Sequence, residues 1–440
     1  MTDATNNPPR HKTSLHTVDA RTKRRNASEA RFKMYGMTAI LIGLAFLAIL
    51  AVSIIRAGTP AFTRTVFDME LTLTQAEFEA AEKQLMKTKA YQAVFIDQLS
   101  AKLTEQNVQV AFDGKAIDRL LGKIGGDLRA HYRANPGDLG KPVQFTLPAS
   151  SRVDGYFNGK VTRDTLVDSR FLEVSDLDLV DALHEAGIIH SAFNWTFITA
   201  ADSSVDNPGG AGIGASVVGS FFMMIVVLGL SLPIGVAASI YLEEFAPKNR
   251  FTDLIEVNIA NLAAVPSIVF GILGLAVFIQ FMHLPNSAPL VGGLVLTLMT
   301  LPTIIISTRA ALKAVPPSIR DAALGVGASK MQAVFHHVLP LAMPGILTGT
   351  IIGLAQALGE TAPLLLIGMV GFVAREYPDG LAEGFLNANS AMPAQIYTWA
   401  ARADSAFYDK AWGGIIILLI FLLTMNIIAI LLRRRFERRW

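Results

Sequence analysis

The sequence contains no cysteine, which excludes a disulfide framework, thiol catalysis and a cysteine-ligated metal site. Charged residues make up only 17% of the 440 residues and hydrophobic residues 52%, a balance too apolar for an ordinary soluble protein of this length. The net charge of +2 offers no argument for nucleic-acid binding. The phosphate-binding pattern Gly-x-x-x-x-Gly-Lys-Ser/Thr occurs nowhere in the sequence, so ATP binding by that route is excluded.

The sequence contains several long apolar runs. A helix needs about 20 mostly apolar residues to cross the hydrocarbon core of a bilayer. The stretches that qualify are residues 35–55, 212–242, 257–282, 289–306, 341–369 and 411–432. The sequence therefore predicts an all-α polytopic membrane protein with six transmembrane helices.

Basic residues set the expected orientation of these helices. A basic tail, residues 1–34, precedes the first span, and a second, residues 433–440, follows the last one. Lysine and arginine are enriched in cytoplasmic flanks, so both termini are expected in the cytoplasm, which an even number of spans allows. Residues 56–211 and 371–410 are then extracytoplasmic, and residues 315–340 form a cytoplasmic loop.

The segment between the first two spans is long enough for a domain of its own. Strands are predicted at residues 67–73, 141–151 and 156–161, and helices at 76–103, 116–133 and 175–186, the last with Ser175 as its N-cap. We therefore expect a small extracytoplasmic α+β domain over residues 56–205. Its sequence shows no metal-ligand or catalytic spacing, which favours a packed spacer or a docking module.

The predicted cytoplasmic loop has a patterned sequence. Residues 321–323 favour a helix, and Gly327 permits the left-handed turn that ends one. A second short helix is predicted over residues 329–338, with Ser329 as its N-cap and its end near Pro340. Two short helices that meet at a glycine form a rigid knob able to transmit a displacement. From spacing alone, an interfacial amphipathic connector without a partner is an equal alternative.

This loop resembles the EAA motif of ABC-importer permeases, in which Glu-Ala-Ala is followed by a glycine and then by an Ile-x-Leu-Pro ending. The matching residues are Asp321, Ala322, Ala323, Gly327, Leu339 and Pro340. Asp321 replaces the glutamate of the motif, and His337 stands where the motif has isoleucine. The resemblance implies that these residues form an ATPase-coupling loop, which docks into a groove of a nucleotide-binding subunit.

A carboxylate lies inside the fifth predicted span. Glu360 is flanked by Gly359, which permits close helix approach, and by Pro363, which frees a backbone carbonyl and favours a kink. A charged residue at membrane depth is costly and is by default a candidate functional residue. The structural alternative is a hydrogen bond or ion pair between Glu360 and a neighbouring subunit, and the two roles are compatible.

Residues 358–365 resemble the corresponding helix of the PstA-type permease subunits of phosphate ABC importers. Residues 211–240 and 265–271 are similar to the same family, and the resemblance covers about residues 193–432. The domain that precedes them resembles the extra domain of some proteobacterial members. The resemblance implies a permease of the ABC-importer type in the bacterial inner membrane, which moves inorganic phosphate by alternating access and is not itself an enzyme.

The resemblance also implies a translocation pathway along the fifth span. Its residues would be Gln356, Gly359, Glu360, Thr361 and Pro363, with Arg309 as the nearest basic candidate. Family members often carry an arginine near the position of Gln356, whereas this chain is neutral there. The positive potential for an anion is therefore expected from helix N-termini, backbone amides or an arginine of a partner.

The expected partners follow from the same resemblance. They are a second permease subunit (PstC-like), an ATPase dimer (PstB-like) and an extracytoplasmic phosphate-binding protein (PstS-like), assembled in a lipid bilayer and without nucleic acid. No cofactor is expected in this chain, because ATP and Mg²⁺ belong to the partner ATPase.

Three other interpretations stay open at this point. A permease for another oxyanion, sulfate or molybdate, would have the same architecture. A membrane-embedded enzyme would use Glu360 as its base, although no second carboxylate, histidine pair or Ser/Lys set lies at comparable depth in the sequence. An assembly or signalling scaffold would use the external domain as a sensor.

Overall fold

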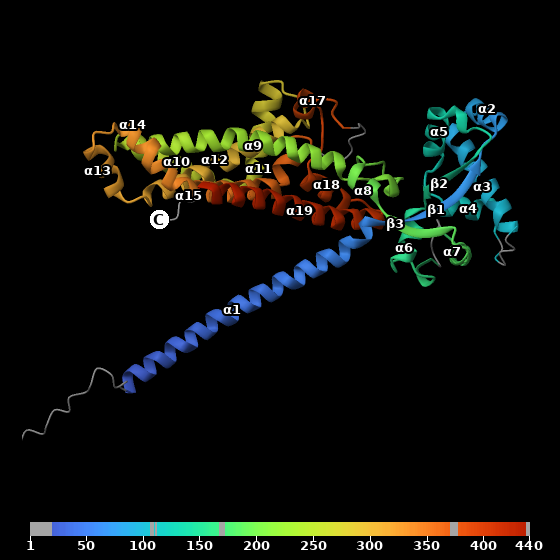
Figure 1. Ribbon diagram of the computed structural model, residues 1–440, viewed down its shortest axis with the longest axis horizontal. Helices are drawn as coiled ribbons and strands as arrows, with labels where there is room; N and C mark the ends of the chain where they lie inside the picture. The colour runs from blue at the N-terminus through green and yellow to red at the C-terminus, as the bar shows by residue number, and fades with distance from the viewer. Residues whose placement is uncertain (1–19, 106–109, 111, 167–171, 370–376, 437–440) are drawn as a thin grey trace, which may run out of the picture. The chain divides into compact units, whose positions relative to one another are not determined.

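The computed structural model describes residues 20–105, 110, 112–166, 172–369 and 377–436, in two compact units that divide between Arg56 and Ala57 (Figure 1). The first unit is built by helix α1 (Ala20–Gly58), whose last residues pass into the second unit. Charged residues occupy its start, from Arg21 to Lys33, and exposed apolar side chains cover residues 34–55, for example Phe46 at 69% and Leu47 at 62%. A helix that is apolar all round is suited to lipid and not to water.

The second unit begins with a three-stranded antiparallel sheet in the order β2-β1-β3. Its strands are β1 (Thr63–Thr72), β2 (Pro142–Pro148) and β3 (Ile189–Phe193). Phe67, Met69 and Leu71 of β1 are buried, as an alternating strand with one face on a core requires. The strands predicted at 67–73 and 141–151 are confirmed, while β3 has no counterpart among the predictions.

Helices share a core with this sheet. They are α2 (Gln75–Lys83), α3 (Lys87–Glu105), α4 (Gly114–Leu120), α5 (Gly125–Ala134), α6 (Ser151–Phe157) and α7 (Val174–Glu185). The single helices predicted over 76–103 and 116–133 are each broken in two. Gln84 and Leu121 take extended backbone at the breaks, so the helical hydrogen bonds cannot continue through them.

Two local predictions in this region are wrong. Residues 156–161 do not form a strand, because Tyr156 lies in helix α6. Helix α7 is capped by Glu173 and not by Ser175. The amide of Glu173 donates a hydrogen bond to the carboxylate of Asp176 at 2.8 Å, so this carboxylate fixes the helix start before Ser175 is reached.

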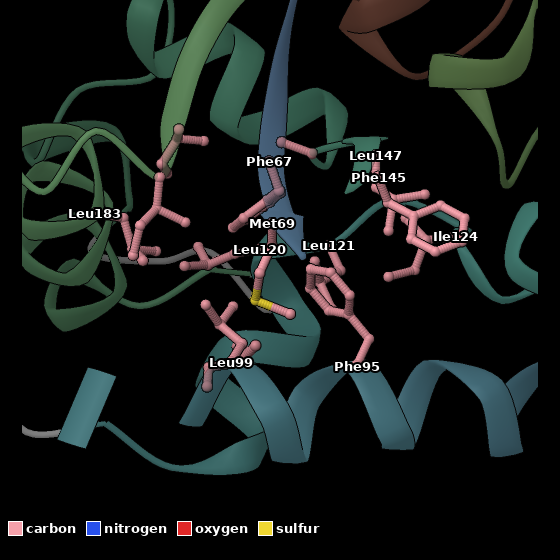
Figure 2. Packing of buried hydrophobic residues seen from close by; sticks show 14 of the residues in the cluster. Phe67, Met69, Phe95, Leu99, Leu120, Leu121, Ile124, Phe145, Leu147 and Leu183 are labelled. Carbon is pink, nitrogen blue, oxygen red and sulfur yellow. The ribbon is translucent and has the colours of Figure 1, made fainter. Parts of the chain in front are cut away.

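The sheet and its helices enclose a hydrophobic core (Figure 2). Phe67 and Met69 of β1 point into it from the sheet, and Phe95 and Leu99 of α3 meet them from the helical side. The rings of Phe67 and Phe95 pack edge to face, with their centroids 6.1 Å apart. This part of the chain therefore combines α and β structure around a core of its own.

The rest of the second unit is helical. Its elements are α8 (Trp195–Thr199), α9 (Gly214–Ile240) with the π-helical turn η5 (Tyr241–Phe245), α10 (Arg250–Ala263), α11 (Ser267–Gly274) with η6 (Leu275–Phe281), α12 (Pro289–Lys313), α13 (Pro317–Gly325), α14 (Lys330–Gln332) with η7 (Ala333–Val338), α15 (Leu339–Gly359), α16 (Ala362–Leu366), α17 (Leu381–Leu386), α18 (Met392–Ala400) and α19 (Ser405–Phe436). Figure 1 shows α9, α12, α15 and α19 running alongside one another. Among the described residues, five helices are long and apolar enough to cross a membrane, or six if the bent pair α10 and α11 is one span.

Two predicted spans differ from the structure. The helix expected over 257–282 is bent by 100° between α10 and α11. Pro266 lies at this bend and accounts for it. Proline disfavours helical backbone in the residue before it, and a new helix starts after it. The helix expected over 341–369 ends at Gly359, where Glu360 takes extended backbone before the short helix α16.

Small residues bring the long helices close together. A Cβ atom added at Gly235 of α9 would lie 2.7 Å from Ile304 of α12, and one added at Gly293 of α12 would lie 2.5 Å from Val226 of α9. Helices in membranes gain van der Waals contact through such close approach. Helices α9 and α12 are thus closely packed at two positions along their lengths.

Two neighbouring glycines at the start of α5 allow a matched test of its packing on α3. A Cβ at Gly125 would lie 1.9 Å from the carbonyl oxygen of Thr88, whereas a Cβ at Gly126 would meet nothing within 4 Å. We expect Gly125→Ala to lower the free energy of unfolding by about 2 kcal/mol, since a backbone atom cannot move aside cheaply. In the same thermal denaturation experiment, Gly126→Ala should stay within about 0.5 kcal/mol of the unsubstituted protein. Equal stability of the two variants would contradict this packing.

Candidate functional site

The segment between α12 and α15 folds as two short helical pieces joined by a turn, as predicted. Helix α13 is followed by Gly327, whose φ of +90° lies in the left-handed region that favours glycine. The second piece starts with α14 and runs on through the π-helical turn η7. Residues 317–338 are called the coupling segment below.

Ser329 caps the second piece, as predicted. Its hydroxyl accepts a hydrogen bond from the amide of Gln332 at 3.2 Å, and the Gln332 side chain accepts one from the amide of Ser329 at 2.9 Å. This capping box satisfies two amides that a helix start leaves unpaired. The helix end predicted near Pro340 is wrong, because η7 passes directly into α15. The coupling segment is therefore continuous with a long apolar helix.

The coupling segment has a buried and an exposed side. Val334 and Val338 are 2% and 0% exposed and share a core with residues of α9, α12 and α15. On the exposed side, Leu324 is 48% and Val326 is 86% exposed, while Met331 lines an apolar pocket with residues of α9 and α15. Exposed apolar side chains of this kind favour contact with another protein.

The predicted coupling residues are divided between these two sides. Asp321, Ala322 and Gly327 are exposed, Ala323 is buried, and Leu339 and Pro340 are half-buried at the start of α15. The exposed three lie where a docking subunit has access to them. Their role in docking stays a prediction.

Arg320, which the sequence analysis did not single out, holds the base of the coupling segment. It donates from Nη1 to the carbonyl of Val315 at 2.7 Å and from Nη2 to the carbonyl of Leu312 at 2.9 Å. Its Nε and Nη2 also donate to the carboxylate of Glu244, at 3.1 and 2.7 Å. The available sequence signals were a basic residue directly before Asp321 and an acidic pair after the second apolar run.

Arg309, the basic candidate for the pathway, lies near the same end of α12. Its Nη2 donates to Glu256 of α10 at 2.6 Å, and its Nε donates to Glu243 of η5 at 3.3 Å. Lys313 also pairs with Glu243, at 3.5 Å. Within the described residues no hydrogen bond or ion pair joins Arg309 to Glu360, and its role in the pathway stays a prediction.

Glu360 stands where helix α15 stops. Its amide donates to the carbonyl of Ala357 at 3.2 Å, and its side chain is half-buried. Gln356 and Gly359, three residues apart on α15, are exposed, so they share a side that the described chain leaves open, and Glu360 follows directly after it. In the part of the chain that the structure describes, the Glu360 side chain has no hydrogen bond or ion pair. Its role in a translocation pathway stays a prediction.

Thr361 and Pro363 do not share the exposed side of Gln356 and Gly359. Pro363 is buried against α11, where a Cβ added at Gly271 would lie 2.7 Å from the Pro363 Cα. Thr361 is the N-cap residue of α16 but makes no side-chain cap hydrogen bond. The kink predicted at Pro363 is in fact a break in the helix between Gly359 and Ala362. The predicted pathway residues thus do not all share one surface.

Comparisons with known proteins match most of this chain in two parts. Residues 231–440 match the family described as "Binding-protein-dependent transport system inner membrane component". Residues 19–166 match a family described as a domain of unknown function.

Several transport proteins are similar in sequence. The chain is 31% identical over 248 residues to the phosphate transport system permease protein PstA 2 of Mycobacterium bovis, covering 56% of this chain and 79% of that protein. It is 31% identical over 211 residues to PstA 1 of Mycobacterium tuberculosis, covering 48% of this chain and 66% of that protein. It is 33% identical over 176 residues to the "Probable ABC transporter permease protein YqgI" of Bacillus subtilis, covering 40% of this chain and 58% of that protein.

A solved structure is also similar. An inward-facing conformation of the MetNI methionine ABC transporter is 17% identical and covers 52% of this chain and 95% of its own, with a TM-score of 0.39. The family assignment rests on the sequence similarities and not on this structural similarity.

The turn of the coupling segment can be tested with a pair of glycines. Gly327 has a φ of +90° while Gly325 ends a regular helix, and a Cβ would meet nothing within 4 Å at either position. We expect Gly327→Ala to weaken the turn by about 1 kcal/mol, because L side chains disfavour left-handed backbone. Amide hydrogen exchange around the turn should then accelerate roughly fivefold. Gly325→Ala should leave it unchanged, and unchanged exchange in Gly327→Ala would refute the turn.

Proposed function

Because the chain belongs to the PstA family of binding-protein-dependent transport permeases, we propose that it is the membrane subunit of an ATP-driven importer of inorganic phosphate. The chain is a transport subunit and not itself an enzyme. Phosphate as cargo is supported by the names of its relatives and by the similarity of residues 358–365 to that family. The transport mode that we propose is alternating access across the bacterial inner membrane.

The coupling segment is the observation that carries this proposal. Its outer side exposes apolar residues, and its inner side is packed on three long helices. The sequence has no P-loop of its own, so the energy for transport would come from a separate ATPase that docks on this segment and carries ATP and Mg²⁺. The continuity of the segment with α15 supports this role, because a displaced helix moves as a unit.

The open side of α15 is the second element of the proposal. Gln356 lies on it exposed, and Glu360 follows at its end half-buried. A second permease subunit facing this side would enclose a passage between the two chains, with Glu360 at its wall. The exposed position of Gln356 and the ion pairs of Arg309 leave the positive charge for the anion to the partner or to backbone amides.

The proposed topology follows the basic tails. Both termini and the coupling segment lie in the cytoplasm, and the α+β domain lies outside, where an extracytoplasmic phosphate-binding protein would dock. The remaining partners are a second permease and an ATPase dimer.

Gly327→Asp tests the docking of the ATPase. A side chain at this φ strains the turn and adds a charge to the exposed side of the knob. We expect loss of ATPase co-purification and of phosphate uptake. The control is Gly140→Asp, which has the same kind of strain, with a φ of +77° and nothing within 4 Å of a Cβ, but lies in the α+β domain. Intact uptake and ATPase binding in Gly327→Asp would show that the coupling role is wrong.

Glu360→Gln tests whether Glu360 lines the proposed passage. Removing the charge while keeping the shape should lower phosphate uptake severalfold, because a carboxylate at membrane depth is costly to keep without a function. Glu383→Gln removes an exposed carboxylate from α17 and should transport normally. Unchanged uptake in Glu360→Gln, at normal expression, would reduce Glu360 to a structural role.

A further inference from the structure

The connection between α12 and the coupling segment forms a pivot. Helix α12 ends at Lys313 and α13 begins at Pro317, so residues 314–316 alone join them. Val315 in this connection is 5% exposed and belongs to the core beneath the segment. The hydrophobic effect is non-directional, so burial of Val315 restrains the angle between the two helices less than directional hydrogen bonds do.

One guanidinium group crosses this pivot. Arg320 of α13 reaches back to the carbonyl of Leu312, in the last turn of α12, and to that of Val315, in the connection. It also binds the carboxylate of Glu244 through two nitrogens. Hydrogen bonds between charged groups are shorter and stronger than neutral ones, and the guanidinium fork adds direction. Helix α13 therefore cannot turn on residues 314–316 without breaking several of these bonds together.

Glu244 brings a third helix into the contact. It belongs to η5, the π-helical turn that follows α9, and lies 76 residues before Arg320 in the chain. The Glu244 and Arg320 side chains are 7% and 23% exposed, so salt screens this pair less than a pair on the open surface. The second half of the coupling segment meets the same turn, because the ammonium of Lys330 lies 5.3 Å from the ring centroid of Phe245.

We propose that the Arg320–Glu244 pair locks the pivot between α12 and α13, so that a displacement of the coupling segment reaches α9 and α12 as a rigid-body movement. This inference rests on the proposed function, since it presupposes a partner that moves the segment. Arg320 is a positioning residue, because it acts through the orientation of α13. Without the pair, the displacement bends residues 314–316 and the long helices stay in place.

Glu243, next to Glu244 on the same turn, provides a matched control. It pairs with Arg309 and Lys313 of α12, and no ion pair joins it to α13 among the described residues. Arg309 keeps its contact with Glu256 when Glu243 is replaced. Glu243→Gln thus removes a neighbouring carboxylate and leaves the pivot locked.

The first measurement is the amount of phosphate transported per ATP hydrolysed by the complete complex in liposomes. We expect Glu244→Gln to lower this ratio about tenfold, as for the loss of a hydrogen bond to a charged group. The ATPase should still co-purify and hydrolyse ATP. Arg320→Lys, which keeps the charge but not the fork, should give an intermediate ratio, and Glu243→Gln an unchanged one. An unchanged ratio in Glu244→Gln, or an equal loss in Glu243→Gln, would overturn the proposal.

The second measurement does not depend on the cargo. Since the chain has no cysteine, spin labels can be attached at Ser318→Cys in α13 and at Ile234→Cys in α9, where both residues are exposed. One narrow distance distribution, with and without ATP, is expected for the otherwise unsubstituted complex. Glu244→Gln should broaden it, and a distribution that stays narrow overturns the lock. A complex that moves no phosphate while the distribution broadens would refute the proposed cargo and keep the lock.

Discussion

The hydrogen bonds of Arg320 join elements that are far apart in the chain: the end of α12, the turn after α9 and the coupling helix α13. The apolar core beneath the coupling segment supplies contact area, and the charged hydrogen bonds add a directional restraint. Helix α15 needs no such bond, because the coupling segment continues into it. With α9 and α12 packed closely through Gly235 and Gly293, three long helices can respond to one displaced knob.

A second constraint comes from the membrane. Extended backbone at membrane depth is tolerated only where protein covers it or water lines it, because lipid offers no hydrogen-bond partner. The break follows α15 at Glu360, and Gln356 and Gly359 beside it are exposed within the described residues. In the proposed function, a second subunit or a water-filled passage would meet this side. The break in α15 would then serve both assembly and transport.

Local sequence signals predicted local structure well. The alternation around Met69 predicted β1, and Gly327 and Ser329 predicted the turn and the cap of the coupling segment. Predictions failed where two local signals competed. Pro266 divided one apolar run into two helices, and an extended Gln84 divided another helical pattern. The Arg320–Glu244 pair could not be read from the sequence, since its partners are 76 residues apart and only the packing of α9 on α12 brings them together. The open side around Glu360 was likewise beyond sequence, because exposure depends on which helices surround it.

The central claim is that this chain turns ATP hydrolysis on a partner into movement of phosphate. The most direct measurement is ATP-dependent accumulation of radiolabelled phosphate in liposomes that hold this chain with its second permease and ATPase, supplied with the phosphate-binding protein. The account predicts accumulation that needs ATP, stops when this chain is omitted, and is not reduced by excess sulfate or molybdate. Uptake of sulfate or molybdate in place of phosphate, or accumulation that persists without this chain, would contradict it.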